Sequence, residues 1–164
     1  MTSSADDLLP GIEVRCSEVH GRGVFATREL RARQTIGDYS GQRYIDGDSH
    51  EDWDGGLTYL FGLSDGTTID GAQGGNATRH INHACVPNVE AVEWRGPDEV
   101  LSVSIRALRR IRVGEELFLD YALVIAESED PAGYPCECGH IACRKSMAAP
   151  ARGARAVGDD SGAG

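Results

Sequence analysis

The stretch Arg79-His80-Ile81-Asn82-His83-Ala84-Cys85-Val86-Pro87-Asn88 carries a guanidinium, two imidazoles, two amides and a thiol within ten residues. A later segment, Cys136-Glu137-Cys138-Gly139-His140-Ile141-Ala142-Cys143, adds three thiols, one fewer than a zinc ion held by cysteine alone requires. Cys16 and Cys85 are the candidates for the fourth ligand. Cys16 lies in a predicted strand, where a cysteine commonly serves as a small buried apolar residue. Cys85 follows an ordered turn, so its direction is better fixed. If Cys85 is the ligand, the segment that carries Cys136 to Cys143 folds back over Asn82 and His83.

Composition limits the kind of protein and its partners. A chain of 164 residues fits one domain. The formal net charge of -10 argues against direct nucleic-acid binding, because phosphate contacts need clustered Lys and Arg, and it favours a basic peptide as partner. No apolar run approaches the ~20 residues of a membrane helix, so no membrane partner is expected.

The first ten residues have neither the basic nor the apolar region of a secretory signal. We therefore expect the five cysteines to be reduced or metal-bound and the protein to be cytoplasmic, or nuclear and chromatin-associated if it is eukaryotic or delivered to a host. Only Lys145 among the 16 basic residues is lysine. If the protein is an enzyme that modifies lysine, this composition gives it almost no lysine of its own on which to act.

Short strands dominate the pattern, so the fold class is mainly β. Leu101, Val103, Ile105 and Ala107 alternate with polar residues, as expected for a strand with one buried face. An Asp-Gly pair at Asp65-Gly66 indicates a hairpin turn. Only Asp46 to Asp54 is expected to form a short helix. The predicted strands are Ile12 to Arg15, Val24 to Thr27, Thr35 to Tyr39, Tyr59 to Leu63, Thr67 to Ile69, Val89 to Trp94, Leu101 to Ala107 and Leu117 to Leu119.

The ends of the chain differ in composition from its middle. Residues 1–11 are polar and are expected to be flexible, whereas residues 12–122 hold the predicted strands. Acidic residues with Pro and Gly indicate a linker over 123–134, and the thiol module occupies 135–147. The tail over 148–164, rich in Ala, Arg and Gly, has nothing to bury and is expected to be disordered.

Taken together, these motifs resemble the SET-domain protein lysine methyltransferases with a post-SET zinc module. The resemblance runs from about Val14 to Lys145. It rests on Gly21 to Ala26, on Asp38-Tyr39-Ser40-Gly41, on Tyr59-Leu60-Phe61, on Arg79 to Asn88, on Gly114 to Tyr121, and on Cys136-x-Cys138 followed by Cys143-Arg144.

The resemblance implies a SET-domain β-clip of several small sheets, with a pseudoknot-like C-terminal crossing and a small zinc-bound post-SET module. It also implies methyl transfer from S-adenosylmethionine to the ε-amine of a lysine in a protein substrate, such as a basic histone-like tail. The residues it assigns are Gly21, Arg22, Gly23, Arg79, Asn82 and His83 for the cofactor, Cys85, Cys136, Cys138 and Cys143 for structural zinc, Tyr121 and Tyr59 for catalysis, and Leu119 for the substrate pocket.

Ordinary roles remain open for several of these residues. A Gly-x-Gly segment is commonly a turn, and Arg79 can be a surface charge. Asn82 and His83 can be turn residues that satisfy their own backbone. Tyr121 can be a strand-end tyrosine with a solvated hydroxyl. For Asp120 a structural hydrogen bond is expected.

Three departures from the family pattern affect what can be carried over. Ala84 replaces a serine, and Gln42 replaces the glutamate that closes the Tyr-x-Gly-Glu strand. Leu119 stands where the family has Phe or Tyr, two residues before the catalytic tyrosine. In the family this position tunes how many methyl groups the pocket admits, so the smaller leucine predicts room for a di- or trimethylated product. The cysteine-rich pre-SET region is also missing.

Two other function classes fit the same residues. The chain can be a catalytically inactive SET-like module that binds basic peptides, which titration with S-adenosylmethionine would distinguish. It can also be a zinc-stapled interaction protein. In that case a chelator would unfold the tail without affecting methyl transfer.

Overall fold

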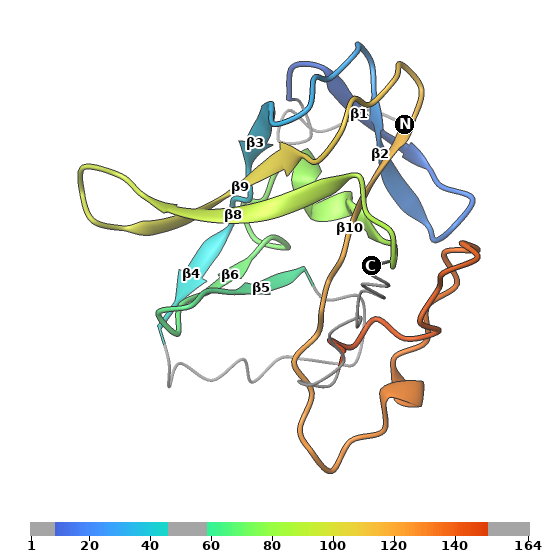
Figure 1. Ribbon diagram of the computed structural model, residues 1–164. Coiled ribbons are helices and arrows are strands. Elements are labelled where there is room, and N and C mark those ends of the chain that lie inside the picture. Colours follow the sequence, from blue (N-terminus) through green and yellow to red (C-terminus); the bar gives the residue numbers. More distant parts are fainter. Residues whose placement is uncertain (1–8, 46–58, 151–164) are drawn as a thin grey trace, which may run out of the picture.

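The computed structural model describes residues 9–45 and 59–150 (Figure 1). Their strands form three small sheets, with the strand orders β1-β2-β10-β7, β3-β9-β8 and β4-β6-β5. The mainly β fold expected from the sequence is confirmed. The strands are β1 (Ile12–Cys16), β2 (Arg22–Ala26), β3 (Thr35–Asp38), β4 (Gln42–Tyr44), β5 (Leu60–Gly62), β6 (Thr68–Asp70), β7 (Asn82–His83), β8 (Val89–Arg95), β9 (Leu101–Ala107) and β10 (Glu116–Leu119).

The first sheet contains strands from three of the quoted motifs, with β2 inside the motif Gly21 to Ala26, β7 inside Arg79 to Asn88 and β10 inside Gly114 to Tyr121. β1 and β2 form an antiparallel hairpin in which Val14 pairs with Val24. β10 pairs antiparallel with β2 on one side and parallel with β7 on the other, where Leu119 lies opposite His83. A strand from residue 116 onward is thus inserted between two much earlier segments. This arrangement brings the end of β10 beside the Asn82–His83 segment.

The second sheet shows why alternation in the sequence predicts a strand. In β9 the apolar residues are buried and the intervening polar ones are partly exposed. β8 pairs with all seven residues of β9, from Val89 opposite Ala107 to Arg95 opposite Leu101. Completely burying a Val or Ile side chain stabilises the fold by about 1.5–3 kcal/mol. Val103 and Ile105, both at 0% exposure, are therefore among the residues that fix this register.

The third sheet is built around the predicted Asp-Gly turn. Phe61 of β5 pairs with Ile69 of β6, and Ile69 also pairs with Arg43 of β4. The turn places Gly66 at φ +86° and uses the Asp65 carboxylate to accept a hydrogen bond from the Thr67 amide at 3.0 Å. The hairpin expected at this site is confirmed.

Two strands and a helical turn were not expected from the sequence. β4 and β7 are only three and two residues long, and η2 (Ala77–His80) is a 3-10 turn capped by Asn76. Asn82 and His83 therefore lie in a strand and not in a turn. The short helix expected over Asp46 to Asp54 lies outside the described residues.

The C-terminal segment leaves β10, turns at η3 (Pro131–Gly133) and returns toward the end of that strand (orange to red in Figure 1). Isolated bridges pair Leu123 with Ala148 and Pro135 with Ser146. Ala148, which the sequence analysis assigned to the tail, is buried at 4% exposure. At the other end, Leu9 packs against the main core cluster. The Leu123–Ala148 and Pro135–Ser146 bridges thus join the two ends of the segment that carries the three C-terminal thiols.

Candidate functional site

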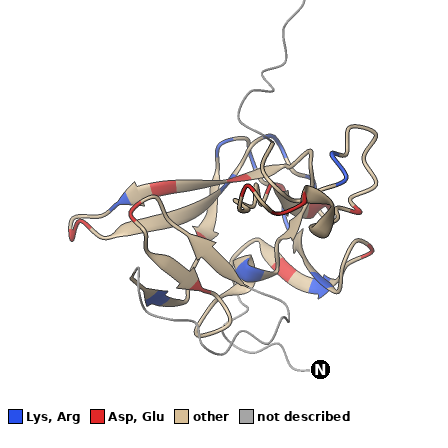
Figure 2. Ribbon diagram, turned by 90° about the horizontal axis from the view of Figure 1, so that it is seen from below, with Lys and Arg blue, Asp and Glu red and all other residues tan. Residues whose placement is uncertain are grey.

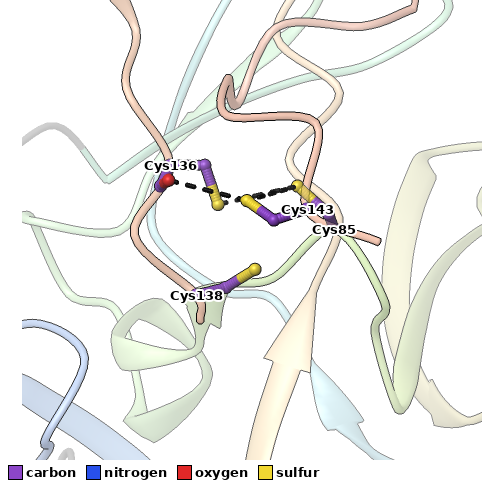
Figure 3. A group of neighbouring side chains, drawn as sticks. All are labelled: Cys85, Cys136, Cys138 and Cys143. Carbon is purple, nitrogen blue, oxygen red and sulfur yellow. Dashed lines mark hydrogen bonds between the residues drawn. The ribbon is translucent and has the colours of Figure 1, made fainter. Parts of the chain in front are cut away.

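Four thiols from two distant parts of the chain converge on one point (Figure 3). The sulfurs of Cys85, Cys136, Cys138 and Cys143 all lie within 4.8 Å of one another. The Sγ of Cys85 is 3.6 Å from that of Cys136 and 3.8 Å from that of Cys143. A tetrahedral zinc ion with Zn–S bonds of ~2.3 Å separates its sulfurs by about 3.8 Å. The donor set and its spacing therefore fit zinc held by four thiolates.

All four thiols would have to ionise together to hold a metal ion. Burial raises the pKa of the Cys136 thiol to about 12. Burial acts in the same direction on Cys138, but hydrogen bonds from the backbone of Cys85 and His140 outweigh it and lower the pKa of Cys138 to about 7. Metal-free, the cluster would hold few negative charges at neutral pH. Four thiolates become stable together only around a bound cation.

Backbone pairing positions the thiols. The amide of Cys136 donates to the carbonyl of Lys145 at 3.2 Å, and the amide of Arg144 donates to the Cys85 sulfur at 3.3 Å. Cys16 lies at the end of β1, outside the cluster, and is exposed. Its expected burial as a small apolar residue is wrong, because the last residues of β1 face solvent.

Tyr121 lies just beyond β10, beside the thiol cluster. Its hydroxyl donates to the carbonyl of buried Ile81 at 2.8 Å, and its ring lies 5.3 Å from that of His83. The residue as a whole is 39% exposed, but its hydroxyl is bonded to the backbone of a residue that is only 3% exposed. Burial, with a smaller contribution from Tyr59, raises the pKa of Tyr121 to about 12. The hydroxyl is therefore held and protonated, not freely solvated.

Tyr59 lies close enough to influence Tyr121 electrostatically and is held by a residue that the sequence analysis did not assign to the site. The hydroxyl of Tyr39 donates to the Tyr59 carbonyl at 2.5 Å. Burial, with Tyr121 next in effect, raises the pKa of Tyr39 above its ordinary value. The Tyr59 ring meets the buried His80 ring edge-on at 5.5 Å. Three tyrosines thus gather in this region.

The glycine segment Gly21–Gly23 is anchored by the Asn82 side chain. The Asn82 amide donates to the backbone carbonyls of His20 and Arg22, at 3.2 and 3.0 Å, and to the Glu116 carboxylate at 3.0 Å. Gly21 has φ +47°, and a Cβ on buried Gly23 would lie 2.1 Å from the Glu116 carboxylate oxygen. Glycine therefore suits the positive φ at residue 21, and at residue 23 it lets the Glu116 carboxylate approach closely.

Arg79 and His83 are both engaged with their neighbours. The Arg79 guanidinium donates to the Gly75 carbonyl at 2.8 Å, within the turn that precedes η2. His83 is buried, and its Nδ1 accepts a hydrogen bond from the Tyr121 amide at 3.1 Å. Burial, aided by the charge of Arg144, lowers the pKa of His83, although the nearby Asp120 opposes this. His83 is thus neutral, with its ring proton on Nε2.

Residues 21–122 match the SET domain family, which covers more than half of the chain. This chain belongs to the SET-domain family. Similar proteins include histone-lysine N-methyltransferase trithorax of Drosophila melanogaster, 36% identical over 138 residues, and histone-lysine N-methyltransferase 2B of Homo sapiens, 37% identical over 138 residues. Histone-lysine N-methyltransferase ASHH3 of Arabidopsis thaliana is 33% identical over 138 residues. Each alignment covers 80% of this chain, but only 4%, 5% and 36% of the three relatives.

The described part of this SET-domain chain has a mixed charge distribution, with acidic and basic segments interspersed along the ribbon (Figure 2). Nine of the 26 acidic residues and two of the 16 basic ones lie outside the described ranges, which leaves a formal charge of −3 within them. Among residues 9–45 and 59–150, no helix is long and apolar enough to cross a membrane.

The SET-domain structure connects most of the predicted residues into two groups, with Arg79 lying apart in the turn before η2. Residues from β7 and β10 join the thiol cluster to Tyr121, and the Asn82 side chain joins this region to the glycine segment. Tyr39 and Arg144 are two residues of this region that were not predicted from the sequence. Tyr39 stands in the quoted Asp38-Tyr39-Ser40-Gly41 motif, which was the available signal. Arg144 follows the last thiol, but its partner could not be inferred from spacing.

Proposed function

We propose that this SET domain transfers methyl groups from S-adenosylmethionine to the ε-amine of lysine in a protein substrate, and that a basic histone-like tail is such a substrate. The observation that supports this most is the placement of Tyr121, with its hydroxyl desolvated at the junction of β7, β10 and the thiol cluster. The names of the similar proteins, which are histone-lysine methyltransferases, support a basic, histone-like substrate.

The substrate amine must be neutral before it can attack a methyl group. An unperturbed lysine has a pKa of ~10.4, so only roughly four molecules in ten thousand are neutral at pH 7. S-adenosylmethionine supplies a sulfonium-bound methyl, and the adjacent positive charge favours the neutral amine. The desolvated surroundings of Tyr121 and Tyr39 act in the same direction, because burial penalises a charged ammonium.

Tyr121 would orient the amine by accepting a hydrogen bond from it. The hydroxyl proton is already donated to the Ile81 carbonyl, and the raised pKa keeps that proton in place near neutral pH. The oxygen lone pairs remain to accept an N–H from the amine. That bond would turn the nitrogen lone pair toward the methyl group, which is the in-line arrangement that displacement requires. Tyr59 would provide the second hydroxyl.

The cofactor would bind where the glycine segment meets β7. Gly21, Arg22 and Gly23 would allow its close approach, and the backbone and side chains of Asn82 and His83 would surround it, with Arg79 nearby. In the structure the Asn82 amide already holds the glycine segment. Asn82 would therefore act largely by shaping the cofactor site.

Leu119 would set the product. It is buried at the end of β10, opposite His83 in the parallel pairing and two residues before Tyr121. Its side chain is smaller than Phe or Tyr and has no hydroxyl to hold a water. We therefore assign a di- or trimethylated lysine as the product.

Zinc would be structural, held by Cys85, Cys136, Cys138 and Cys143. Four protein thiolates fill a tetrahedral site and leave no open position for a substrate. The ion's contribution would be to fasten the C-terminal segment beside Tyr121.

Incubation with labelled S-adenosylmethionine and a protein extract, followed by mapping of the labelled lysines, tests the proposal. The experiment uses the Lys145→Arg variant alongside the wild-type protein. This variant contains no lysine, so any label on lysine reports transfer to another protein. Label on lysine that disappears with Tyr121→Phe is expected. If the Lys145→Arg protein binds the cofactor and labels nothing, the chain is a SET-like binding module instead.

A further inference from the structure

Arg144 links the thiol cluster to the end of β10. Its guanidinium forms two parallel hydrogen bonds with the Asp120 carboxylate, from Nη1 and from Nη2, both at 2.8 Å. Its backbone amide donates to the Cys85 sulfur at 3.3 Å. The two side chains are only 25% and 30% exposed. Paired geometry and partial burial make this stronger than an ordinary surface ion pair.

Asp120 in turn holds the backbone that follows Tyr121. Its Oδ1 accepts a hydrogen bond from the Ala122 amide at 3.0 Å, while the Tyr121 amide is held separately by His83 Nδ1 at 3.1 Å. Ala122 has φ +43°, a conformation that a non-glycine residue adopts only when its surroundings impose it. The Asp120 carboxylate provides such a constraint.

The Arg144 guanidinium has one further unusual feature. Its Nε is the only buried side-chain N or O atom without a hydrogen-bond partner in residues 9–45 and 59–150. An unpaired buried donor costs about 1–3 kcal/mol. The two Nη–Asp120 hydrogen bonds hold the guanidinium in place despite this cost.

We infer that Arg144 and Asp120 form a positioning pair that transmits closure of the four-thiol site to Tyr121. Closure fixes Arg144 through its neighbour Cys143 and through the Cys85 sulfur, and Arg144 then fixes Asp120 and the Tyr121–Ala122 peptide. The contact between His83 Nε2 and the Cys85 sulfur, at 3.5 Å, offers a parallel route, but a thiol–imidazole contact is weaker than a paired ion pair. This inference rests on the proposed function for its catalytic consequence only.

The structural test is amide hydrogen exchange at Tyr121 and Ala122 in Arg144→Met and Asp120→Asn. Both variants should accelerate exchange there by about tenfold or more, as should zinc removal from the wild-type protein, and zinc content should stay at one ion per chain in both variants. In Arg144→Met, zinc removal should add no more than about twofold at these two amides. Equal acceleration by zinc removal in wild type and Arg144→Met would overturn the inference.

The catalytic test is a double-mutant cycle on methyl transfer to a lysine peptide. Each single variant should lower kcat by about tenfold or more with little change in KM, because the tyrosine is misplaced and the binding sites are not. The double variant should be no worse than the poorer single one, and effects that multiply would overturn the inference. Arg144→Lys, which keeps the charge but not the paired geometry, replaces Arg144→Met if that protein does not fold.

The matched control is Arg106→Met. Arg106 pairs with Glu90 at 2.9 Å on β8 and β9, with comparable exposure of 36% and 38%. Its loss should change neither the exchange at Tyr121 nor kcat. A wild-type protein without methyl transfer would overturn the proposed function, whereas the exchange experiment would still decide whether the ion pair positions Tyr121.

Discussion

Replacing Gly23 with alanine should destabilise the protein by about 3 kcal/mol and weaken cofactor binding. The new Cβ would lie 2.1 Å from Oε1 of Glu116 and 3.0 Å from the Cβ of Ser17. To reach an ordinary contact of 3.4 Å, the Glu116 carboxylate would have to move by about 1.3 Å. That movement breaks its hydrogen bonds with the Ser17 hydroxyl at 3.1 Å and the Asn82 amide at 3.0 Å.

The magnitude follows from those two bonds. A hydrogen bond to a charged group contributes about 1.5–3 kcal/mol, and the lower value applies because Glu116 is only partly buried. Their joint loss gives about 3 kcal/mol, or a fall in Tm of roughly 10 °C for a domain of this size. Urea unfolding followed by circular dichroism measures the change, and calorimetric titration with S-adenosylmethionine measures the effect on binding.

Two matched variants make the experiment specific. Gly62→Ala on β5 places a Cβ where no atom lies within 4 Å, so its stability should be unchanged or slightly higher. In a Glu116→Ala background the obstacle is gone, so Gly23→Ala should cost less than about 1 kcal/mol. If Gly23→Ala costs as little as Gly62→Ala, or costs the same with and without Glu116, the close approach is not what requires glycine.

Three further outcomes are expected. Cys85→Ser should lower the bound zinc well below one ion per chain by atomic absorption, whereas Cys16→Ser should leave it at one, and equal losses would contradict the assignment of the ligands. Leu119→Phe should shift the product toward monomethyl-lysine in mass spectra, and an unchanged product would mean that Leu119 does not line the pocket. The pKa of Glu115 is lowered because hydrogen bonds, first from Arg109, outweigh its burial. Its stabilisation is therefore complete above pH 4.5 and is lost as the pH falls through its lowered native value. Acid unfolding curves for wild type and Glu115→Gln should converge in that range, and a constant difference would exclude Glu115 as its source.

Local patterns predicted the longer strands well. The alternation in β9 and the Asp65-Gly66 turn depend on neighbouring residues alone, so they could be found without the structure. β7 could not, because its two residues, Asn82 and His83, form a strand only through pairing with β10, more than thirty residues later. Such pairing depends on topology and leaves no periodic signal.

The metal site could be predicted because a zinc ion held by cysteine alone needs four ligands. Three cysteines lie close together in the C-terminal segment, so the sequence predicted a fourth ligand elsewhere, and Cys85 was the favoured candidate. Tyr39 was not assigned because its contact is with the backbone carbonyl of Tyr59, and carbonyls are present at every position. Arg144 was not assigned because its partner, Asp120, is one of many acidic residues in the chain.

Mass analysis of a lysine peptide after incubation with S-adenosylmethionine and the zinc-loaded protein tests the central claim most directly. Wild type should add methyl groups to the lysine side chain. Tyr121→Phe should add none, while retaining one zinc ion and wild-type affinity for the cofactor. Undiminished methylation by Tyr121→Phe would contradict the claim that the desolvated Tyr121 hydroxyl aims the amine.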